Sequence, residues 1–342
     1  MSDSQKLRVG VIGLGFMGKT HVRAYAKAAE AGLPCELVAV CDDDRDRRRG
    51  KVAASGNIGD TSGDEQLFDP DTVAAYARAE SLLEDEDVDV VSICTPTPTH
   101  VSLACAALLS GKHVLVEKPV ALTSVEVSQL LTVAEATDRV CMPAMCMRFW
   151  PGWSWVLEQI QSEALGAPLS ATFHRLGSQP AWSEEFYGNP IQSGGAMVDL
   201  HVHDSDFVMA CFGTPAAVVS TGTRNHITSL YRYRKGPDHV VAEGGWGHSK
   251  GFDFRMRFVI VFEQATVDFD LARDPMLQIS RDGTQEAVPL DPGDGYDGEI
   301  RHFLECLANG KPPSVNLTDA LAVTRMLEAE RKSLETESEI RL

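Results

Sequence analysis

A lysine, an aspartate and a histidine in this chain have the types and spacing needed to oxidise an alcohol. Lys118 closely follows the apolar run 114–116, and Asp199 stands four residues before His203 in a stretch with helical character. Oxidation of a secondary alcohol requires a base for the hydroxyl proton and a cation that stabilises the developing alkoxide. Histidine titrates near neutrality and can accept the proton, and a lysine ammonium can donate to the oxygen. We therefore interpret these three residues as candidate catalytic residues.

A glycine loop, Gly13-x-Gly15-x-x-Gly18, lies between an apolar stretch, 7–13, and a helix-like stretch, 19–31. The first glycine permits a tight turn, the second lets backbone N–H groups approach a pyrophosphate, and the third lets the helix pack closely on the strand. The N-terminus of that helix carries about half a positive charge, which favours the anion. This context predicts a dinucleotide-binding site.

The charged segment after the second apolar stretch, 37–41, begins with Asp42. A carboxylate there can accept both ribose hydroxyls of NAD and would repel the 2′-phosphate of NADP. Arg45, Arg47 and Arg48 follow and can accommodate that phosphate, so NADP stays possible while NAD is favoured. The alternative interpretation is that the segment is a solvated turn and helix start with no cofactor role.

A threonine- and proline-rich loop, 95–99, follows the third apolar stretch, 88–94. Ligands of open parallel sheets collect at the carboxyl ends of the strands, and the two prolines stiffen a loop that can line the nicotinamide ribose. A rigid turn with Thr99 as the cap of the next helix is an equally open interpretation. The residues expected to contact the cofactor are Gly13, Gly15, Phe16, Met17, Gly18, Asp42, Thr95, Pro96, Thr97, His100, Glu117, Lys118 and Pro119.

The pattern of the elements changes near residue 150, and a chain of 342 residues is long enough for two cores. Apolar stretches alternate with helix-like stretches before that point, which predicts a parallel sheet covered on both faces. Later stretches such as 252–258 alternate polar and apolar residues, which suits an antiparallel sheet with one packed face. The expected fold class is α/β, with a nucleotide-binding domain over 1–147 and an α+β domain for substrate binding and oligomerisation over 148–342, whose last helices can pack back on the first domain.

Individual elements follow from the same periodicity. The expected strands are 7–13, 37–41, 88–94, 113–116, 140–147, 171–175, 217–223, 240–246, 252–262 and 265–270. The expected helices are 19–31, 71–79, 100–109, 124–137, 153–162, 197–212, 298–308 and 317–333. Residues 56–70 are rich in Gly, Asp and Ser and are expected to form an exposed insertion without an assigned function.

Composition excludes several classes of partner. A net charge of −18 opposes binding to nucleic acid or to anionic lipid, although local basic patches can still hold a phosphorylated ligand. No run of about 18 apolar residues is present that would cross a bilayer, and the start lacks the basic and apolar segments of a secretory signal, so we expect a cytoplasmic protein. Eight cysteines without metal-finger spacing predict reduced, buried thiols.

Several ordered motifs together resemble one family. They are the glycine loop, Thr95-Pro96-Thr97-Pro98-Thr99-His100, Glu117-Lys118-Pro119, Gly194-Gly195-Ala196-Met197-Val198-Asp199-x-x-x-His203, and Phe303-Leu304-Glu305-Cys306-Leu307-Ala308-Asn309-Gly310-Lys311-Pro312-Pro313. From about Leu7 to Leu342 the chain resembles the glucose-fructose oxidoreductase, inositol dehydrogenase and rhizopine catabolism protein family (Gfo/Idh/MocA).

The resemblance implies an N-terminal Rossmann domain and a C-terminal α+β domain whose large, mostly antiparallel sheet commonly mediates dimers or tetramers. It implies an NAD(P)-dependent dehydrogenase or reductase that acts on a sugar, a cyclitol or a sugar derivative. Lys118 matches the active-site lysine of the family, and Asp199 and His203 match its acid/base pair. His201 stands where many relatives carry glycine, and we expect it to reshape the substrate pocket.

Further side chains are candidates for the substrate side of the site. A tryptophan can stack on a pyranose face, and an arginine can bind hydroxyls or a phosphate. Core packing is the alternative explanation for each of them. The expected substrate contacts are Lys118, Arg148, Arg175, Trp182, Asp199 and His203, with His174 a further candidate.

Other classes of site and function stay open as alternatives. His201 and His203 would point about 200° apart on a helix, so we expect no metal there. A nucleotide-sugar dehydrogenase would use the same chemistry and draw on the arginines. A catalytically silent sensor would retain the cofactor alone, and steady NADH production with any polyol would exclude it.

Overall fold

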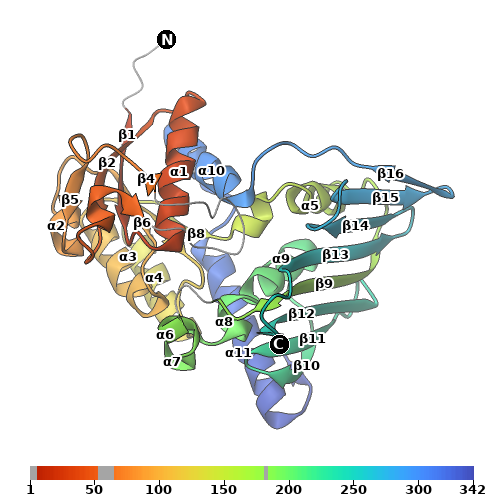
Figure 1. The fold of residues 1–342 in the computed structure, drawn as a ribbon. Coiled ribbons are helices and arrows are strands. Elements are labelled where there is room, and N and C mark those ends of the chain that lie inside the picture. The colour runs from red at the N-terminus through yellow and green to blue at the C-terminus, as the bar shows by residue number, and fades with distance from the viewer. Residues whose placement is uncertain (1–5, 53–64, 181–183) are drawn as a thin grey trace. The chain divides into compact units, whose positions relative to one another are not determined.

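The computed structural model describes residues 6–52, 65–180 and 184–342, and the chain divides into two compact units (Figure 1). The first unit comprises Met1–Met145 and Tyr296–Leu321, and the second comprises Cys146–Gly295 and Ala322–Leu342. The segment 296–321 therefore belongs with the first unit although it comes late in the chain. Trp182 and most of the expected insertion, 56–70, lie outside the described residues. No helix within the described ranges is long and apolar enough to cross a bilayer.

The first unit is built on a six-stranded sheet in the order β5-β2-β1-β6-β7-β8, with every paired strand parallel. The strands are β1 (Leu7–Ile12), β2 (Cys35–Cys41), β5 (Ala74–Tyr76), β6 (Val90–Ile93), β7 (His113–Glu117) and β8 (Cys141–Ala144). The strand order reverses between β1 and β6, and in doubly wound sheets ligands bind beside such a reversal at the carboxyl ends of the strands.

The first unit also contains several helices, the last of which begins at Gly295 and connects none of these strands. They are α1 (Phe16–Glu30), α2 (Ala79–Leu83), α3 (His100–Leu109), α4 (Ser124–Glu135) and α10 (Gly295–Asn309), with the 3-10 turns η1 (Arg47–Arg49) and η2 (Thr97–Thr99) and the small hairpin β3 (Lys51–Val52) and β4 (Glu65–Gln66). α4 begins with a capping box, because the Thr123 hydroxyl accepts from the Glu126 N–H and donates to its carboxylate. The expected helix 71–79 is wrong, since Ala74 to Tyr76 pair with β2 as an edge strand.

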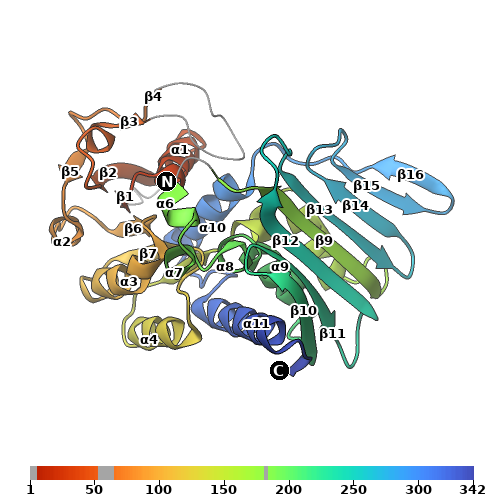
Figure 2. The same ribbon diagram turned by 60° about the horizontal axis from the view of Figure 1, so that its bottom comes forward.

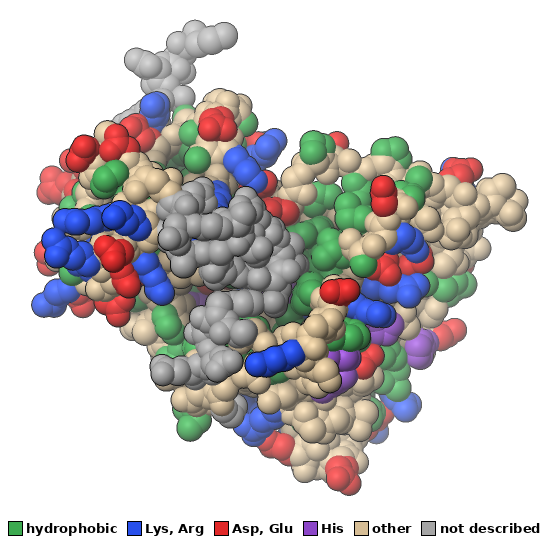
Figure 3. Space-filling view, in the orientation of Figure 1, with side chains coloured by type: hydrophobic (Ala, Val, Ile, Leu, Met, Phe, Trp, Pro, Cys, Tyr) green, Lys and Arg blue, Asp and Glu red, His purple; other side chains and the backbone are tan. Residues whose placement is uncertain are grey.

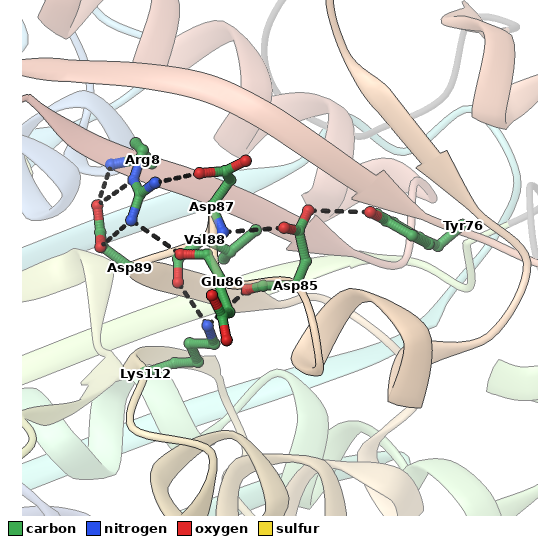
Figure 4. Close-up of polar contacts among 8 residues, drawn as sticks. All are labelled: Arg8, Tyr76, Asp85, Glu86, Asp87, Val88, Asp89 and Lys112. Carbon is green, nitrogen blue, oxygen red and sulfur yellow. Dashed lines mark hydrogen bonds and ion pairs between the residues drawn. The ribbon is translucent and has the colours of Figure 1, made fainter.

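A polar network fastens the amino ends of β1 and β6 (Figure 4). The Arg8 guanidinium donates to both carboxylate oxygens of Asp89 at 2.9 and 3.0 Å. The Lys112 ammonium donates to the carbonyls of Asp85 and Val88 at 2.6 and 2.7 Å. These residues lie at the edge of the sheet opposite the glycine loop, so the network stabilises the sheet without contacting the cofactor end.

The second unit contains a nine-stranded sheet in the order β16-β15-β14-β13-β9-β12-β11-β10-β17. Its neighbouring strands pair antiparallel except β9 and β12, which are parallel. The strands are β9 (Pro168–Ser178), β10 (Ala217–Thr223), β11 (His226–Arg232), β12 (His239–His248), β13 (Arg255–Phe262), β14 (Thr266–Asp270), β15 (Leu277–Arg281), β16 (Thr284–Ala287) and β17 (Ile340–Arg341). The expected α/β class with a large, mostly antiparallel second sheet is confirmed.

The second part of the chain also contains several helices. They are α5 (Trp153–Gln161), α6 (Glu184–Tyr187), α7 (Pro190–Ser193), α8 (Ala196–Asp199), α9 (Val202–Phe212) and α11 (Leu317–Thr336), with the 3-10 turn η3 (Cys146–Phe149). Of these, α8, α9 and α11 lie along one face of the nine-stranded sheet (Figure 2). The buried Trp153 indole packs edge-on against Phe207, Phe258 and Phe269, with ring centroids 4.8 to 6.0 Å apart. Such aromatic contacts contribute to the core beyond their buried area.

The opposite face of the sheet carries the part-exposed residues of each strand. Along β13, Met256, Phe258 and Ile260 are buried, whereas Val259 and Val261 are half-buried. This period of two is the pattern of a sheet with one packed and one open face. All eight cysteines are free thiols, seven of them buried, as expected.

Candidate active site

The glycine loop joins β1 to α1 in the geometry that a dinucleotide requires. Gly13 has φ +87°, and a Cβ at Gly18 would lie 1.8 Å from the Gly13 carbonyl oxygen, so α1 packs against the loop only because Gly18 has no side chain. A Cβ at Gly15, in contrast, would meet nothing within 4 Å. No side chain caps the start of α1, and the positive end of a helix favours an anion.

Asp42 lies beside this loop at the end of β2. Its carboxylate accepts from the backbone N–H of Leu14 at 2.6 Å and of Asp44 at 2.9 Å, and burial raises the pKa of the carboxyl. The Arg48 guanidinium donates to the carbonyls of Asp42 and Asp43, and Arg47 comes within 3.8 Å of the Asp42 carboxylate. Asp42 is thus buried beside the loop, whereas residues 43–49 are mostly exposed and include the 3-10 turn η1. The cofactor contact of Asp42 therefore stays a prediction beside the alternative of a solvated turn.

His100 connects the two loops that follow β6 and β7. Its Nε2 lies 2.7 Å from the Thr95 carbonyl, and its Nδ1 lies 2.9 Å from the Pro119 carbonyl. The ring is buried, which lowers the pKa of His100. Both ring nitrogens lie against backbone carbonyls, so His100 links the two loops, and its expected contact with the cofactor stays a prediction.

Glu117 has a similar supporting position. One carboxylate oxygen lies 2.9 Å from Nε2 of His21, and the other accepts the backbone N–H of Lys118 at 3.1 Å. Nε2 of His21 also lies 4.0 Å from a carboxylate oxygen of Glu299 on α10, and all three side chains are buried. Glu117 therefore links α1 to the backbone of Lys118, and its expected contact with the cofactor stays a prediction.

Sequence reasoning missed His21 and Glu299, which are separated from Glu117 by long stretches of chain. The ligand atoms of the three residues lie within 4.8 Å of one another, a set that can hold a cation. The 2.9 Å separation of His21 and Glu117 is that of a direct hydrogen bond, which accounts for the contact without an ion. The signal in the sequence that could have pointed to His21 was its position three residues after Gly18, the last glycine of the loop.

Asp199 and His203 lie on either side of an interruption in the expected helix 197–212. α8 ends at Asp199 and α9 begins at Val202, so the two residues do not share one continuous helix. From 201 to 208 every residue is buried except His203. The helix thus presents a single imidazole outside the core at the position where the acid/base residue is expected.

The two arginines expected at the substrate pair with aspartates of α9. Arg175 is 2% exposed and makes two hydrogen bonds to Asp204, at 2.9 and 3.1 Å. Its guanidinium is therefore occupied within the protein, and its expected substrate contact stays a prediction. Arg148 makes the same kind of paired contact with Asp206, at 2.9 and 2.6 Å, and is only partly exposed. Both guanidinium groups position α9 in the second unit.

The structure places His174 but does not describe Trp182. His174 lies on the open face of the sheet, 3.8 Å from Glu243, and Trp182 is outside the described ranges. Lys118 belongs to the first unit, and Asp199 and His203 belong to the second. Their meeting at one substrate is therefore a proposal, taken up below.

A parallel nucleotide-binding sheet with a glycine loop, joined to a large mixed sheet, defines a class of two-domain dinucleotide-dependent oxidoreductases. Residues 7–145 match the family model described as "Oxidoreductase family, NAD-binding Rossmann fold", and residues 153–268 match the one described as "GFO/IDH/MocA C-terminal domain". The chain belongs to the Gfo/Idh/MocA oxidoreductase family.

Characterised relatives cover nearly the whole chain. Inositol 2-dehydrogenase 1 of Saccharopolyspora erythraea is 33% identical over 339 residues, which are 94% of this chain and 92% of that protein. D-xylose 1-dehydrogenase (NADP(+)) 2 of Haloferax volcanii is 26% identical over 279 residues, 78% of this chain and 85% of that protein. The fold is also that of a levoglucosan dehydrogenase solved with NADH and levoglucosan, with a TM-score of 0.82, 22% identity, and coverage of 98% of this chain and 99% of that one.

Proposed function

We propose that the protein transfers a hydride between a nicotinamide cofactor and a secondary alcohol or ketone of a sugar, a cyclitol or a sugar derivative. One observation supports this most strongly. The glycine loop, Thr95 and Lys118 follow β1, β6 and β7, which are adjacent parallel strands. Their carboxyl ends meet at one edge of the sheet, so a cofactor on the loop would have Lys118 close by.

The first unit supplies the cofactor site in this proposal, and the second supplies the substrate site. The open space at Gly15 suits a pyrophosphate, and the Asp42 carboxylate suits a ribose. When bound, the nicotinamide accepts or donates the hydride. We favour NAD because Asp42 lies at the loop and Arg48 is already engaged by carbonyls. NADP is the alternative cofactor, and one relative is named for it.

Three side chains carry the proton chemistry of the proposed reaction. His203 accepts the proton of the substrate hydroxyl, since it is the imidazole that α9 leaves outside the core. The Lys118 ammonium donates to the same oxygen and stabilises its negative charge. Asp199 orients the imidazole or the substrate. Arg148 remains a candidate substrate contact, because its guanidinium is not fully buried.

A homo-oligomer through the open face of the second sheet completes the proposal. Half-buried Leu230, Val259 and Val261 lie on that face, where Glu243 also lies 2.7 Å from His226. Figure 3 shows histidine, charged and hydrophobic side chains gathered over the strands of this unit. Large faces that mix apolar and polar groups in this way are typical of subunit interfaces.

The test is a substrate screen with the purified protein. Polyols, aldoses and nucleotide sugars are offered with NAD and with NADP, and the absorbance of reduced nicotinamide is followed. Turnover of a polyol or aldose supports the proposal, and turnover of nucleotide sugars alone supports the second candidate. That candidate is weakened because Arg148 and Arg175, the arginines that favoured it, are paired with aspartates. Cofactor binding without turnover of any compound would indicate a silent sensor.

A further inference from the structure

His201 lies between Asp199 and His203, and its ring is fully buried. The expected effect of His201 on the substrate pocket stays a prediction. Its Nε2 lies 3.4 Å from a carboxylate oxygen of Glu330 on α11 and 3.3 Å from the Tyr231 hydroxyl on β11. The residue therefore reaches from the interruption between α8 and α9 into the core of the second unit.

Glu330 is the centre of this buried network. The Tyr231 hydroxyl donates to its Oε1 at 2.7 Å, and the Ser205 hydroxyl donates to the same oxygen at 3.1 Å. Buried carboxylates are costly unless they are paired and hydrogen-bonded, and Glu330 has both kinds of partner. Three elements, α9, α11 and β11, are thus joined at one carboxylate.

The charges around His201 favour its protonated form. Burial alone would lower the pKa of His201, but the facing Glu330 carboxylate outweighs burial and raises the pKa above its ordinary value. Asp204 acts in the same direction, whereas Arg175 opposes it. Burial keeps the pKa of Tyr231 well above its ordinary range, so that hydroxyl stays neutral. The contact that joins His201 to Glu330 therefore also favours the charged form of the imidazole.

The sheet has space for this ring at one position. Gly244 of β12 faces His201, and a Cβ there would lie 2.7 Å from its Nδ1 and 2.9 Å from its Cβ. The backbone of His201 is also tied to both helices. Its N–H donates to the Ala196 carbonyl at 2.8 Å, and its carbonyl accepts from the N–H groups of Asp204 and Ser205 at 3.0 Å.

We propose that His201 is a positioning residue, whose contact with Glu330 and Tyr231 fixes the interruption between α8 and α9 and thereby places Asp199 and His203 for proton transfer. The inference rests on the function proposed above. Because reacting groups must be held in a narrow range of positions, a small displacement of this segment lowers turnover strongly.

The experiment compares His201→Gln, Glu330→Gln, the double variant and Tyr231→Phe with the matched control Ser333→Ala. Ser333 lies on α11 three residues beyond Glu330, and its buried hydroxyl accepts from the Ser220 N–H without touching α8 or α9. Turnover is measured against pH, and hydrogen exchange of residues 196–206 is measured without substrate. Tyr231→Phe keeps the charges and serves if a charge variant does not fold.

The positioning role predicts that His201→Gln and Glu330→Gln each lower kcat about tenfold with little change in KM, faster exchange in 196–206 and unchanged NADH binding. The kcat of the double variant should be no lower than that of either single variant, because each single substitution already removes the same contact between His201 and Glu330. In the wild type, kcat should fall at alkaline pH as His201 loses its proton, and His201→Gln should lack that decline.

Several results would overturn the inference. One is faster exchange with an unchanged kcat and pH profile, which would make the pair purely structural. Another is that Ser333→Ala lowers kcat as much as His201→Gln does. Any weakening of the contacts of α11 would then be enough to lower turnover. A wild-type protein that oxidises nothing would overturn the proposed function and, with it, the positioning role, whereas the former two results would leave the proposed function intact.

Discussion

The candidate residues are supported by side chains that lie far away in the sequence. The backbone of Lys118 is held by the carboxylate of Glu117, which in turn faces His21. His203 is the part-exposed residue in 201–208, where the other residues are buried. The motifs predict the reactive groups, whereas the contacts of His21 with Glu117 and of His201 with Glu330 join residues 96 and 129 positions apart by residue number. Sequence spacing carries no signal for such contacts.

Replacing the two reactive groups should abolish most turnover. We expect Lys118→Ala and His203→Ala to lower kcat by a factor of about 10² to 10⁴, the usual contribution of a positioned acid or base. Circular dichroism and NADH fluorescence titration should show a folded protein that still binds cofactor. Near-normal kcat in a folded variant would remove that residue from the mechanism.

Substitutions at two glycines of the loop should have different effects, one mainly on cofactor binding and the other mainly on the stability of the fold. Gly15→Ala meets open space, so we expect stability to change by no more than about 1 kcal/mol. The new methyl should nevertheless weaken NADH binding about tenfold, because it occupies the approach to the pyrophosphate. Gly18→Ala should destabilise the fold by about 3 kcal/mol, since its Cβ would meet the Gly13 carbonyl. Urea unfolding measures the stability of each variant, and NADH titration measures its cofactor binding. Equal losses of stability in the two variants would contradict the different roles given to Gly15 and Gly18.

At the scale of elements, the sequence predicted the strands that carry the candidate site. The sequence-based predictions failed where strand pairing or tertiary contacts, rather than the hydropathy pattern, decide the structure. β1, β2, β6 and β7 were expected within two residues of their observed bounds. β11 was missed because its buried face includes Ser229 and its open face includes Leu230, so hydropathy does not alternate. The interruption between α8 and α9 was missed because 197–212 has continuous helical character in the sequence, whereas the turn at His201 is fixed by tertiary contacts.

The loops after β6 and β7 should respond to pH through His100. Its pKa is lowered by burial, so on acidification the unfolded chain binds the proton before the folded protein does. Stability is then lost as the pH falls below about 6.5, the value of an unperturbed histidine. His100→Gln should lose less stability than the wild type between about pH 7 and 5 in urea titrations. The pKa values of His113 and His302 are also lowered, and both histidines are present in the wild type and in the variant. A parallel loss in the two proteins would exclude His100 as the cause.

A substitution at the opposite edge of the first sheet should change the stability of the protein without changing its activity. Lys112→Met should destabilise the protein by about 1 to 3 kcal/mol, because it leaves two carbonyls without their charged donor. We expect kcat and KM to stay unchanged, since this edge lies away from the glycine loop. A loss of turnover in the folded Lys112→Met protein would show that the two edges are coupled.

At the scale of the whole molecule, the proposed cofactor-binding elements lie in the first unit, and the proposed acid/base residues lie in the second. The proposed surface for assembly is the open face of the second sheet. The pattern of β13 predicted one packed and one open face, and that prediction is confirmed. Which residues occupy the open face followed from strand pairing alone, because register decides which side chains become neighbours.

Assembly should depend on the centre of that face. We expect Val259→Lys to convert an oligomeric wild type into monomers, because a lysine in the middle of an interface would be buried without a partner. Gln285→Lys, at the exposed strand β16, is the matched control. Light scattering after size-exclusion chromatography gives the mass. A wild-type monomer, or an oligomer that survives Val259→Lys, would place assembly elsewhere or exclude it.

The central claim is that residues from the two units act on one substrate beside the cofactor, and a crystal structure with NADH and a substrate from the screen tests it most directly. We predict that the Lys118 ammonium and the His203 imidazole both lie within hydrogen-bonding distance of the same substrate oxygen, with its carbon facing the nicotinamide. A complex in which the Lys118 ammonium is remote from the His203 imidazole, with substrate and cofactor both bound, would contradict the account.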